Sequence, residues 1–256
     1  MIPMKPYDIS NYDRPSVAVD AVVFSVISGE KESYRQNSSP KLAVLLIRRG
    51  EEPFRTRLAL PGGFLRREET IEHALERELL EETGISSASL TPLANYSAPD
   101  RDPRGWIISC ASLALIPECN VRALPESDAD FAGWYELDFE ADSDGNEKIT
   151  LSSSEESVTL GFSDGKCISS EIAFDHAQII YDGLMKLREL VRTGDTLFSL
   201  LPELFKISEM QAIYELVLDK KDSPANFRRK MMNRIEETEM SSSNEGHRPS
   251  KLYRKR

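Results

Sequence analysis

The 256-residue sequence predicts an α+β fold made of two parts: a mixed αβ domain, and a smaller C-terminal domain of helices followed by strands. Three observations indicate this fold. Apolar, β-branched runs of strand length recur in the first part of the chain. Two longer segments repeat apolar residues every three or four positions, which is typical of amphipathic helices. After Pro202, two short segments carry helix-capping signals, and two extended pieces follow them.

Four segments of the first part have the composition of strands. They are rich in Val, Ile, Leu and aromatic residues, which favour a pleated, half-buried surface. The predicted strands are 16–27, 41–48, 106–116 and 131–137. A polar stretch, 28–40, separates the first two, and we expect these two strands to pair as a hairpin.

Residues 70–83 and 174–192 are predicted to be helices. The apolar stripe of the first helix consists of Ile71, Ala74, Leu75 and Leu79. The stripe of the second consists of Ile180, Leu184, Leu187 and Val191. Gly84 and Gly194 follow the two stripes and are predicted to end the helices, Gly84 in the left-handed conformation that glycine adopts readily.

An acidic segment includes the last predicted strand and extends toward the second helix. Residues 125–156 contain 11 acidic side chains and a single basic one, Lys148. Alternating apolar residues on either side of 152–154 predict a solvated hairpin inside an insertion at about 138–170. The predicted boundaries are 1–172 for the first domain, 173–195 for a linking helix and 196–256 for the C-terminal domain.

The charge is distributed unevenly along the chain. The net charge of −11, taken alone, disfavours a nucleic-acid partner, because DNA-binding surfaces are usually basic. Residues 220–256, however, contain 11 basic and five acidic residues, a net charge of +6, so that residues 1–219 carry −17. This asymmetry predicts two parts with different partners.

Several classes of protein are disfavoured. No apolar run approaches the ~18 residues of a membrane span, and no apolar segment of a secretory signal follows the first residues. The three cysteines, Cys110, Cys119 and Cys167, lack the spacing of a zinc site or of a disulfide framework. We therefore expect a cytoplasmic protein without a membrane partner, with buried thiols in a reducing compartment.

Three glutamates occupy one face of the first predicted helix. Glu78, Glu81 and Glu82 are separated by three and four positions, which places their carboxylates together. A bare pattern of this kind is most often a solvated acidic surface. Carboxylates held together in one turn also suit a hard dication such as Mg²⁺ (or Mn²⁺), and the backbone carbonyl of Gly62 is a further candidate ligand.

The wider pattern favours the metal site. The segment from Gly63 to Ile85 resembles the Nudix box, Gly-x5-Glu-x7-Arg-Glu-U-x-Glu-Glu-x-Gly-U with U apolar, at all nine defined positions. With ordinary residue frequencies, a chance match in this chain has a probability on the order of 10⁻⁷. The resemblance implies an α/β/α sandwich and Mg²⁺-assisted hydrolysis of a nucleoside diphosphate linked to another group.

The Nudix resemblance also implies roles for single residues. The metal ligands would be Gly62, Glu78, Glu81 and Glu82, and the catalytic residues Glu69, Arg77, Glu78, Glu81 and Glu82. Arg77 would bridge back to Glu69 and hold the loop between them. One of Glu81 and Glu82, or an acid in a later loop, would help to deprotonate the attacking water. The candidates in that later loop are Glu118, Glu126 and Asp128.

Arginines around the box are candidate substrate-binding residues. Arg101 and Arg104 lie in a turn-rich loop that is either an ordinary surface loop or a contact for phosphate or ribose. Arg49, and with it Arg48, follows a strand and could reach a diphosphate. The loop 101–105 resembles that of Nudix proteins that act on or sense ADP-ribose, as do residues 12–16 and 173–176. Of the histidines, His73 is expected at the surface, and His176 as a capping or packing residue.

The basic end has the pattern of a winged helix-turn-helix. Ser208 and Gln211 predict a capping box for a helix over 209–219, and Ser223 with Pro224 opens a second helix that reaches about residue 234. Two strands, 235–240 and 251–254, would form the wing. The predicted DNA-binding residues are Asn226, Arg228, Arg229, Lys230, Arg248 and Lys251. The alternative is a small basic helical cap with a disordered tail.

The C-terminal region is similar to the winged-helix half of Nudix-related transcriptional regulators, notably at residues 201–205, 226–230 and 248–253. This resemblance implies binding of operator DNA as a homodimer, controlled by ADP-ribose or a related effector. Two functions stay open. One is a Mg²⁺-dependent hydrolase of ADP-ribose or a similar compound, fused to a DNA-binding regulator. The other is a catalytically silent Nudix sensor domain of a repressor, although the complete box favours hydrolysis.

Overall fold

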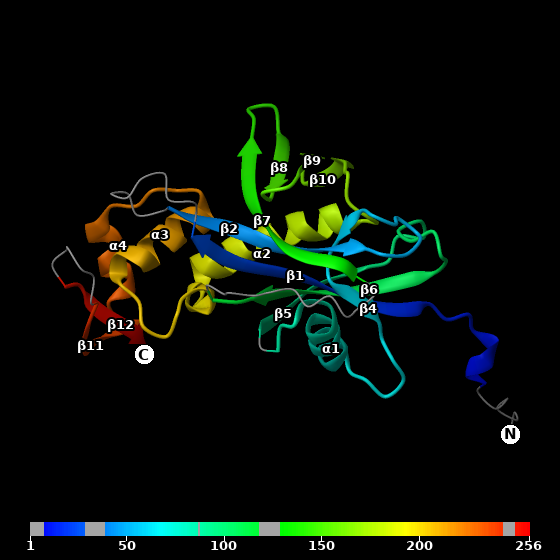
Figure 1. Ribbon diagram of the computed structural model, residues 1–256, viewed down its shortest axis with the longest axis horizontal. Helices are drawn as coiled ribbons and strands as arrows, with labels where there is room; N and C mark the ends of the chain where they lie inside the picture. Colours follow the sequence, from blue (N-terminus) through cyan, green and yellow to red (C-terminus); the bar gives the residue numbers. More distant parts are fainter. Residues whose placement is uncertain (1–7, 29–38, 87, 118–128, 243–248) are drawn as a thin grey trace, which may run out of the picture.

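The computed structural model describes residues 8–28, 39–86, 88–117, 129–242 and 249–256 (Figure 1). The elements in chain order are η1 (Ile9–Asn11), β1 (Ser16–Ser28), β2 (Pro40–Arg49), β3 (Leu58–Ala59), β4 (Gly62–Phe64), α1 (Ile71–Thr83), β5 (Ser89–Tyr96), β6 (Ile107–Leu115), β7 (Ala129–Ala141), β8 (Asn146–Ser152), β9 (Ser157–Ser163), β10 (Lys166–Ser169), α2 (His176–Thr193), η2 (Thr196–Leu200), α3 (Ile207–Leu218), α4 (Pro224–Met231), β11 (Ile235–Ser241) and β12 (Lys251–Lys255). Within these ranges, no helix is long and apolar enough to span a membrane.

One mixed sheet forms the body of the first part. Its strand order is β10-β9-β8-β7-β2-β1-β6-β5, with β3 paired to β2 and β4 paired to β1. The predicted hairpin of the first two strands is confirmed, since β1 and β2 are antiparallel with Phe24 opposite Val44. Strands β1 and β6, in contrast, run parallel, from Ser16 opposite Ile107 to Phe24 opposite Leu115. The long strand β1 therefore has neighbours on both sides, and its centre is buried.

Helices α1 and α2 cover opposite faces of this sheet (Figure 1). The α1 side buries Leu75 and Leu79 against Val19 and Leu45. The α2 side is the larger core, and its helix contributes the predicted stripe of Ile180, Leu184, Leu187 and Val191. The predicted α/β/α sandwich with a C-terminal winged helix is confirmed.

Helix α1 begins and ends where the sequence predicts. The Thr70 hydroxyl accepts a hydrogen bond from the backbone N–H of His73 at 3.3 Å, and Gly84 ends the helix with φ of 72°. His73 itself is exposed, as expected. The predicted stripe is wrong in one position, because Ile71 is 37% exposed. Ile71 lies in the first turn of the helix, and the rest of the predicted stripe, Ala74, Leu75 and Leu79, is buried in the core.

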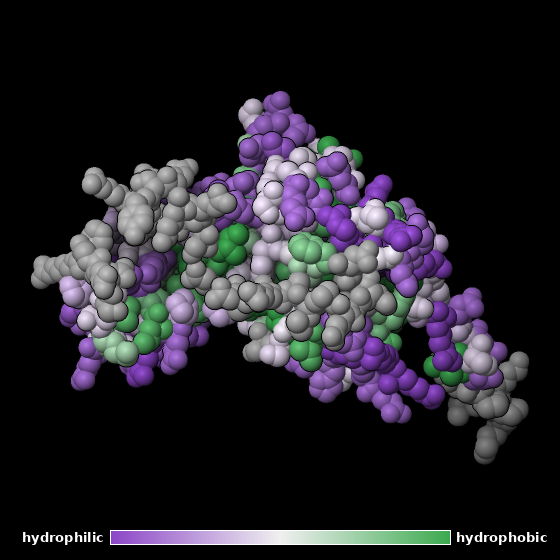
Figure 2. All heavy atoms as spheres, in the orientation of Figure 1, coloured by the Kyte–Doolittle hydropathy of each residue, from purple (hydrophilic) through white to green (hydrophobic). Residues whose placement is uncertain are grey.

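The solvated insertion predicted at 138–170 is wrong for one of its two faces. Strands β8 and β9 are antiparallel, as expected for a hairpin, but they continue the main sheet beyond β7. Their inward residues are fully buried, and Phe162 stacks on Tyr181 of α2 at 4.6 Å between ring centroids. Hydrophilic side chains cover the outer tip of the β7–β8 hairpin (Figure 2). The acidic residues therefore lie mainly on the solvent-exposed side of the sheet, whose other side is packed against α2.

The cysteines are less buried than predicted. Cys110 and Cys167 are half-buried free thiols, and partial burial raises the pKa of both. Cys119 lies outside the described residues.

The C-terminal domain has two helices followed by the two-stranded wing β11–β12. Helix α4 is capped by Ser223 with Pro224 in its first turn, as predicted, and ends at Met231 rather than near residue 234. The predicted capping box of α3 is wrong, because the helix begins earlier. Lys206 is the N-cap residue, and its backbone N–H donates to the Glu209 carboxylate at 2.9 Å.

Both parts of the chain share one hydrophobic core. The cluster that packs α2 on the sheet continues through η2, α3, α4 and the wing. Polar contacts strengthen this junction. The Arg188 Nε–H of α2 donates to the Val217 carbonyl of α3 at 3.0 Å, and Arg234 donates to the Gly194 carbonyl at 2.6 Å. Asp195 pairs with Arg234 and Lys255, which ties the end of α2 to the wing.

Candidate functional site

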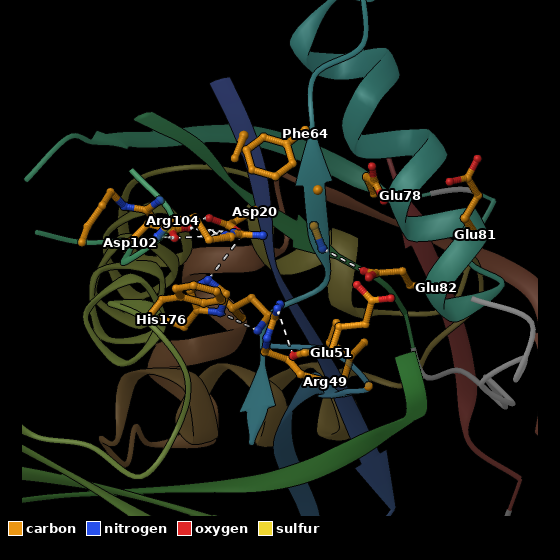
Figure 3. A pocket seen from close by; sticks show the side chains of 18 of the residues that line it. Asp20, Arg49, Glu51, Phe64, Glu78, Glu81, Glu82, Asp102, Arg104 and His176 are labelled. Carbon is orange, nitrogen blue, oxygen red and sulfur yellow. Dashed lines mark hydrogen bonds and ion pairs between the residues drawn. The ribbon is translucent and has the colours of Figure 1, made fainter. Parts of the chain in front are cut away.

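A pocket of about 290 Å³ opens beside the C-terminal half of α1, where β1, the end of β2 and β4 meet. Glutamates of α1 line one side, and Arg104, Asp102 and His176 lie on the opposite side, with Arg49 below them (Figure 3). The pocket therefore offers negative and positive groups across a short gap. Its lining includes Gly62, Glu78, Glu81, Glu82, Arg49, Arg101 and Arg104, all predicted site residues.

Two glycines of β4 let the carboxylates lie directly on the backbone. A Cβ atom at Gly63 would overlap the Glu78 carboxylate, so any other residue there would force the Glu78 side chain to move. The backbone N–H of Gly62 donates to Glu82 Oε2 at 2.8 Å. Gly62 has no room for a side chain, because a Cβ atom there would clash with the backbone of β1. The Nudix-like spacing of glycines and glutamates thus corresponds to direct contact between β4 and α1.

Arg77 holds the loop of the box, as predicted. Its guanidinium donates to both carboxylate oxygens of Glu69, at 2.6 and 3.0 Å, and to the Phe64 carbonyl at 3.2 Å. The same group reaches Glu78 at 2.5 Å and Glu81 at 3.1 Å. The Arg77 hydrogen bonds lower the pKa of Glu69 to about 2, so that this carboxylate stays ionised.

Glu82 has the opposite electrostatic surroundings. Burial, together with the negative charges of Glu78 and Asp20, raises its pKa to about 8. The site thus holds more negative charge than its neighbours neutralise, which is the condition that a bound dication would relieve. An all-oxygen donor set and a glycine-lined approach fit Mg²⁺ or Mn²⁺.

The carboxylates do not converge on one point, however. Among the described residues, no group of three His, Cys, Asp or Glu side chains is already arranged around a common metal position. Glu81 is turned toward Arg77 and Arg66, whose Nη2 lies 3.3 Å from its carboxylate. Binding of a dication by all three glutamates therefore requires Glu81 to exchange these partners for the metal.

Arg49 and Arg104 meet on the opposite side of the pocket. Arg49 Nε donates to the Pro53 carbonyl at 2.8 Å, and its guanidinium lies 4.8 Å from the centre of the Phe174 ring. Arg104 pairs with Asp102 at 2.7 Å and lies 5.2 Å from the same ring. Burial, and after it the positive charge of Arg104, lower the pKa of Arg49. Arg49 and Arg104, two of the three predicted substrate-binding arginines, thus line the pocket.

Arg101 and Arg48 differ from the expectation. The Arg101 side chain is 3% exposed, and its guanidinium makes two hydrogen bonds to Asp175, at 2.7 and 2.9 Å. Arg101 lines the pocket, as predicted, but its buried guanidinium is paired with this carboxylate, as a buried charge requires. Arg48 points to the other face of the sheet, where it pairs with Glu156.

The sequence did not identify Asp20 as a site residue. It is buried, accepts a hydrogen bond from the Ser109 hydroxyl, and lies 3.6 Å from Arg101 and 3.5 Å from His176 Nε2. The available signal was a lone acid inside an otherwise apolar strand, since an unpaired buried carboxylate is costly.

His176 is a packing residue, as predicted. Its Nδ1 accepts a hydrogen bond from the Leu60 N–H at 2.8 Å, which requires the neutral imidazole. Burial lowers the pKa of His176, in agreement with that form. The predicted later-loop acids Glu118, Glu126 and Asp128 lie outside the described residues.

The predicted DNA-binding side chains lie on the exposed face of α4 and on the wing. Asn226, Arg228, Arg229 and Lys230 are all exposed, while Phe227 of the same helix is buried. Some of these cations have acidic partners: Lys230 pairs with Asp222 at 2.6 Å, and Lys251 of the wing pairs with Glu237. Arg248 lies outside the described residues.

Two family models match this chain. The model of the NUDIX domain matches residues 21–148, and the model of the NrtR DNA-binding winged helix domain matches residues 197–254. The two matches coincide with the sheet that carries the pocket and with the domain that carries α3, α4 and the wing.

Similar proteins cover one or both parts. The ADPR responsive transcriptional repressor NtrR of Acinetobacter baylyi is 32% identical over 97% of this chain and 85% of its own length. An ADP-ribose pyrophosphatase of Methanocaldococcus jannaschii is 43% identical, over 38% of this chain and 49% of its own length.

Solved structures with the same architecture include a MutT/nudix family protein from Enterococcus faecalis. It is 30% identical, with a TM-score of 0.77 over 98% of this chain and 90% of its own. Shewanella oneidensis NrtR complexed with a 27mer DNA is 25% identical, with a TM-score of 0.65 over 94% of this chain and 93% of its own.

The sandwich, the glycine-backed glutamates and the exposed basic helix together define a Nudix domain joined to a winged-helix DNA-binding domain. Full-length similarity extends this class to a particular group. The chain belongs to the Nudix family, in the NrtR group whose members carry a C-terminal winged helix.

Proposed function

We propose that this protein is a Mg²⁺-dependent Nudix hydrolase of ADP-ribose or a related nucleoside diphosphate derivative, and that its winged helix makes it an effector-responsive transcriptional regulator. The observation that carries the proposal is the pocket in which Glu78, Glu81 and Glu82 face Arg49 and Arg104. A diphosphate bridged to a dication has the complementary arrangement of charge.

In the proposed mechanism, Glu78, Glu81 and Glu82 hold the metal, with the Gly62 carbonyl as a further ligand. When bound, Mg²⁺ supplies charge neutralisation and Lewis-acid activation at the diphosphate. Arg49 and Arg104 bind phosphate oxygens, and Arg101 positions the loop through Asp175. Arg77 and Glu69 keep the box loop in place, and Glu81 or Glu82 accepts a proton from the attacking water.

ADP-ribose is the proposed ligand because two similar proteins are named for it. The Acinetobacter relative is called ADPR responsive, and the Methanocaldococcus relative is called an ADP-ribose pyrophosphatase. Hydrolysis of the diphosphate would consume one water and yield AMP and ribose 5-phosphate.

The test of the enzyme is turnover of ADP-ribose by the full chain with Mg²⁺, measured as release of AMP. Single substitutions Glu81→Gln and Glu82→Gln should lower the rate by about 10²- to 10⁴-fold, the usual contribution of an acid–base or metal-binding group. Both variants should retain DNA binding, because the winged helix is elsewhere. Absence of turnover across a panel of nucleoside diphosphate derivatives would rule out the hydrolase.

A catalytically silent sensor is the second candidate. Its support is the relative that matches over the full length, which is named as a repressor, together with the engagement of Glu81 by Arg66 and Arg77. In that case binding of ADP-ribose would cause the protein to release its DNA, and no AMP would form. The melting temperature would rise on binding with or without Mg²⁺.

We propose operator DNA as the macromolecular partner. Arg228 and Arg229 project from α4, and a NrtR of similar structure is complexed with DNA. Binding to the chain's own upstream DNA should weaken steeply as salt rises. The double substitution Arg228→Ala/Arg229→Ala should abolish specific binding, whereas Lys166→Ala, at an exposed position on β10, should not. Equal affinity for specific and random DNA would contradict this proposal.

A homodimer in the cytoplasm is part of the proposal, since paired winged helices read two half-sites. Light scattering of the full chain tests the assembly, and a monomer at the concentration of DNA binding would contradict it.

A further inference from the structure

Phe174 stands at the centre of a column of alternating rings and cations. Arg104 lies between two rings, 5.0 Å from the centre of Phe64 and 5.2 Å from that of Phe174. Arg49 lies 4.8 Å from the Phe174 ring. A guanidinium within about 6 Å of a ring is attracted by the electron density of its face. One aromatic side chain therefore contacts two of the arginines that line the pocket, Arg49 and Arg104.

The backbone of Phe174 is held in an uncommon conformation. Its φ of 53° lies in the left-handed region, which bulky residues rarely adopt. The adjoining backbone is fixed by the Ala173 N–H, which donates to the Leu58 carbonyl at 2.8 Å. The rings of Phe54 and His176 lie beside Phe174, at 4.9 and 5.1 Å between ring centroids. Such a conformation persists where the surroundings over-determine it, and it is often associated with a functional site.

The two arginines keep donors available on the pocket side. Arg49 is anchored through Nε to the Pro53 carbonyl, and Arg104 is anchored to Asp102. Both residues nevertheless line the pocket. Two like charges flanking one ring repel each other, and a polyanion that contacts both relieves this repulsion. A diphosphate, with oxygens on two adjacent phosphorus atoms, has the form and charge to do so.

Phe174 also directly precedes the helix that reaches the winged helix. Asp175, the N-cap of α2, receives both hydrogen bonds of the buried Arg101, and His176 is the first helical residue. Figure 1 shows α2 running along the sheet from this point toward α3. At its far end Arg188 donates to the Val217 carbonyl of α3.

We propose that Phe174 is a positioning residue that holds Arg49 and Arg104 as one diphosphate-binding pair and joins that pair to α2, so that occupancy of the pocket changes DNA binding. This inference rests on the proposed function for the identity of the nucleotide. The diphosphate pair itself requires only the column of rings and cations. Phe174 touches neither the glutamates nor the DNA-binding face.

The first experiment compares Phe174→Leu with Phe174→Tyr and Phe54→Leu in the full chain. Phe54→Leu is the matched control, because Phe54 belongs to the same aromatic cluster but does not line the pocket. Calorimetric titrations use inorganic pyrophosphate, ADP-ribose, and Mn²⁺ alone. Phe174→Leu loses two ring–cation contacts, so its affinity for pyrophosphate and for ADP-ribose should be lower by about tenfold or more.

The pattern of variants separates positioning from folding. Phe174→Tyr should bind within about threefold of the wild type, because the ring face is kept. Phe54→Leu should bind normally, and Mn²⁺ affinity should be the same in all four proteins. Equal weakening by Phe54→Leu, or unchanged pyrophosphate binding by Phe174→Leu, would overturn the inference. If Phe174→Leu fails to fold, loss of binding in Phe174→Tyr together with a normal melting temperature would overturn it as well.

The second experiment measures release of the upstream DNA by ADP-ribose. Without ligand, Phe174→Leu should bind DNA as the wild type does. The ADP-ribose concentration for half-release should rise by a larger factor than the dissociation constant of ADP-ribose, because the connection to α2 is lost too. If the half-release concentration and the dissociation constant rise by the same factor, Phe174 does not couple the pocket to DNA binding. If the wild type binds pyrophosphate but not ADP-ribose, the proposed ligand is wrong, but Arg49 and Arg104 still form a diphosphate-binding pair.

Discussion

Among the described carboxyl groups of the pocket, Glu82 is the one whose pKa is raised. In the metal-free protein its pKa is raised to about 8 from an ordinary 4.5 by burial and by neighbouring carboxylates. Between pH 4.5 and pH 8, the Glu82 carboxyl is therefore protonated in the folded protein but ionised in the unfolded chain. The contribution of this proton to stability is complete below pH 4.5 and is lost as the pH rises through 8.

This sign makes a prediction for metal-free protein. Its melting temperature should fall between pH 5.5 and 8 more steeply for the wild type than for Glu82→Gln, which cannot titrate. Over the same range the apparent Mg²⁺ affinity of the wild type should rise by up to about tenfold per pH unit, since the metal displaces one proton. Differential scanning calorimetry with and without EDTA provides the measurement. Identical pH slopes for the two proteins would show that Glu82 is ionised throughout.

At the same scale, local pattern was enough to predict the glutamates of the pocket but not all of the residues that surround them. Glu78, Glu81 and Glu82 share one helix, so their spacing alone places them together. Asp20 and Phe174 are about 150 positions apart in the chain and contact the same pocket. Their proximity depends on how β1 and the start of α2 pack, and a sequence pattern does not contain that information. The pairing of Arg101 with Asp175 was not predicted for the same reason, since the two residues are 74 positions apart.

Among the elements, β8 and β9 illustrate how tertiary packing overrides composition. The segment is acidic enough to suggest a solvated hairpin, yet its alternating apolar residues face α2. A period of two places the apolar side chains of β8 and β9 on one side. Glu147 shares that side, where it accepts a hydrogen bond from the Tyr181 hydroxyl of α2 at 2.6 Å. Helix caps, in contrast, are local, and those of α1 and α4 were predictable from Thr70, Gly84 and Ser223.

The buried face of this hairpin should contribute substantially to stability. Phe162 is fully buried against Tyr181, so Phe162→Ala should lower the free energy of unfolding by about 3–5 kcal/mol. Ile168→Ala, at a position that is 66% exposed on the neighbouring β10, should change it by less than about 0.5 kcal/mol. Urea denaturation followed by circular dichroism measures both. A negligible effect of Phe162→Ala would mean that the hairpin is an independent appendage.

For the whole molecule, the shared core determines how the two domains respond to ligand. The hydrophobic cluster runs without interruption from the sheet through α2 to the wing, and Arg188 joins α2 to α3. Domains joined in this way unfold together, so a ligand that binds only the folded pocket stabilises both by the same amount. At about 100 times its dissociation constant, that amount is about 2.7 kcal/mol.

Hydrogen exchange measures this coupling directly. ADP-ribose with Mg²⁺ should slow exchange in α1, beside the pocket, and also in α3, none of whose residues lines the pocket. Arg188→Ala removes the hydrogen bond to Val217 and should reduce the protection of α3 while leaving that of α1 unchanged. Arg192→Ala, exposed one turn further along α2, is the matched control and should behave as the wild type. If α3 gains no protection in the wild type, the pocket and the winged helix are energetically independent, and the ligand must act on DNA binding by another route.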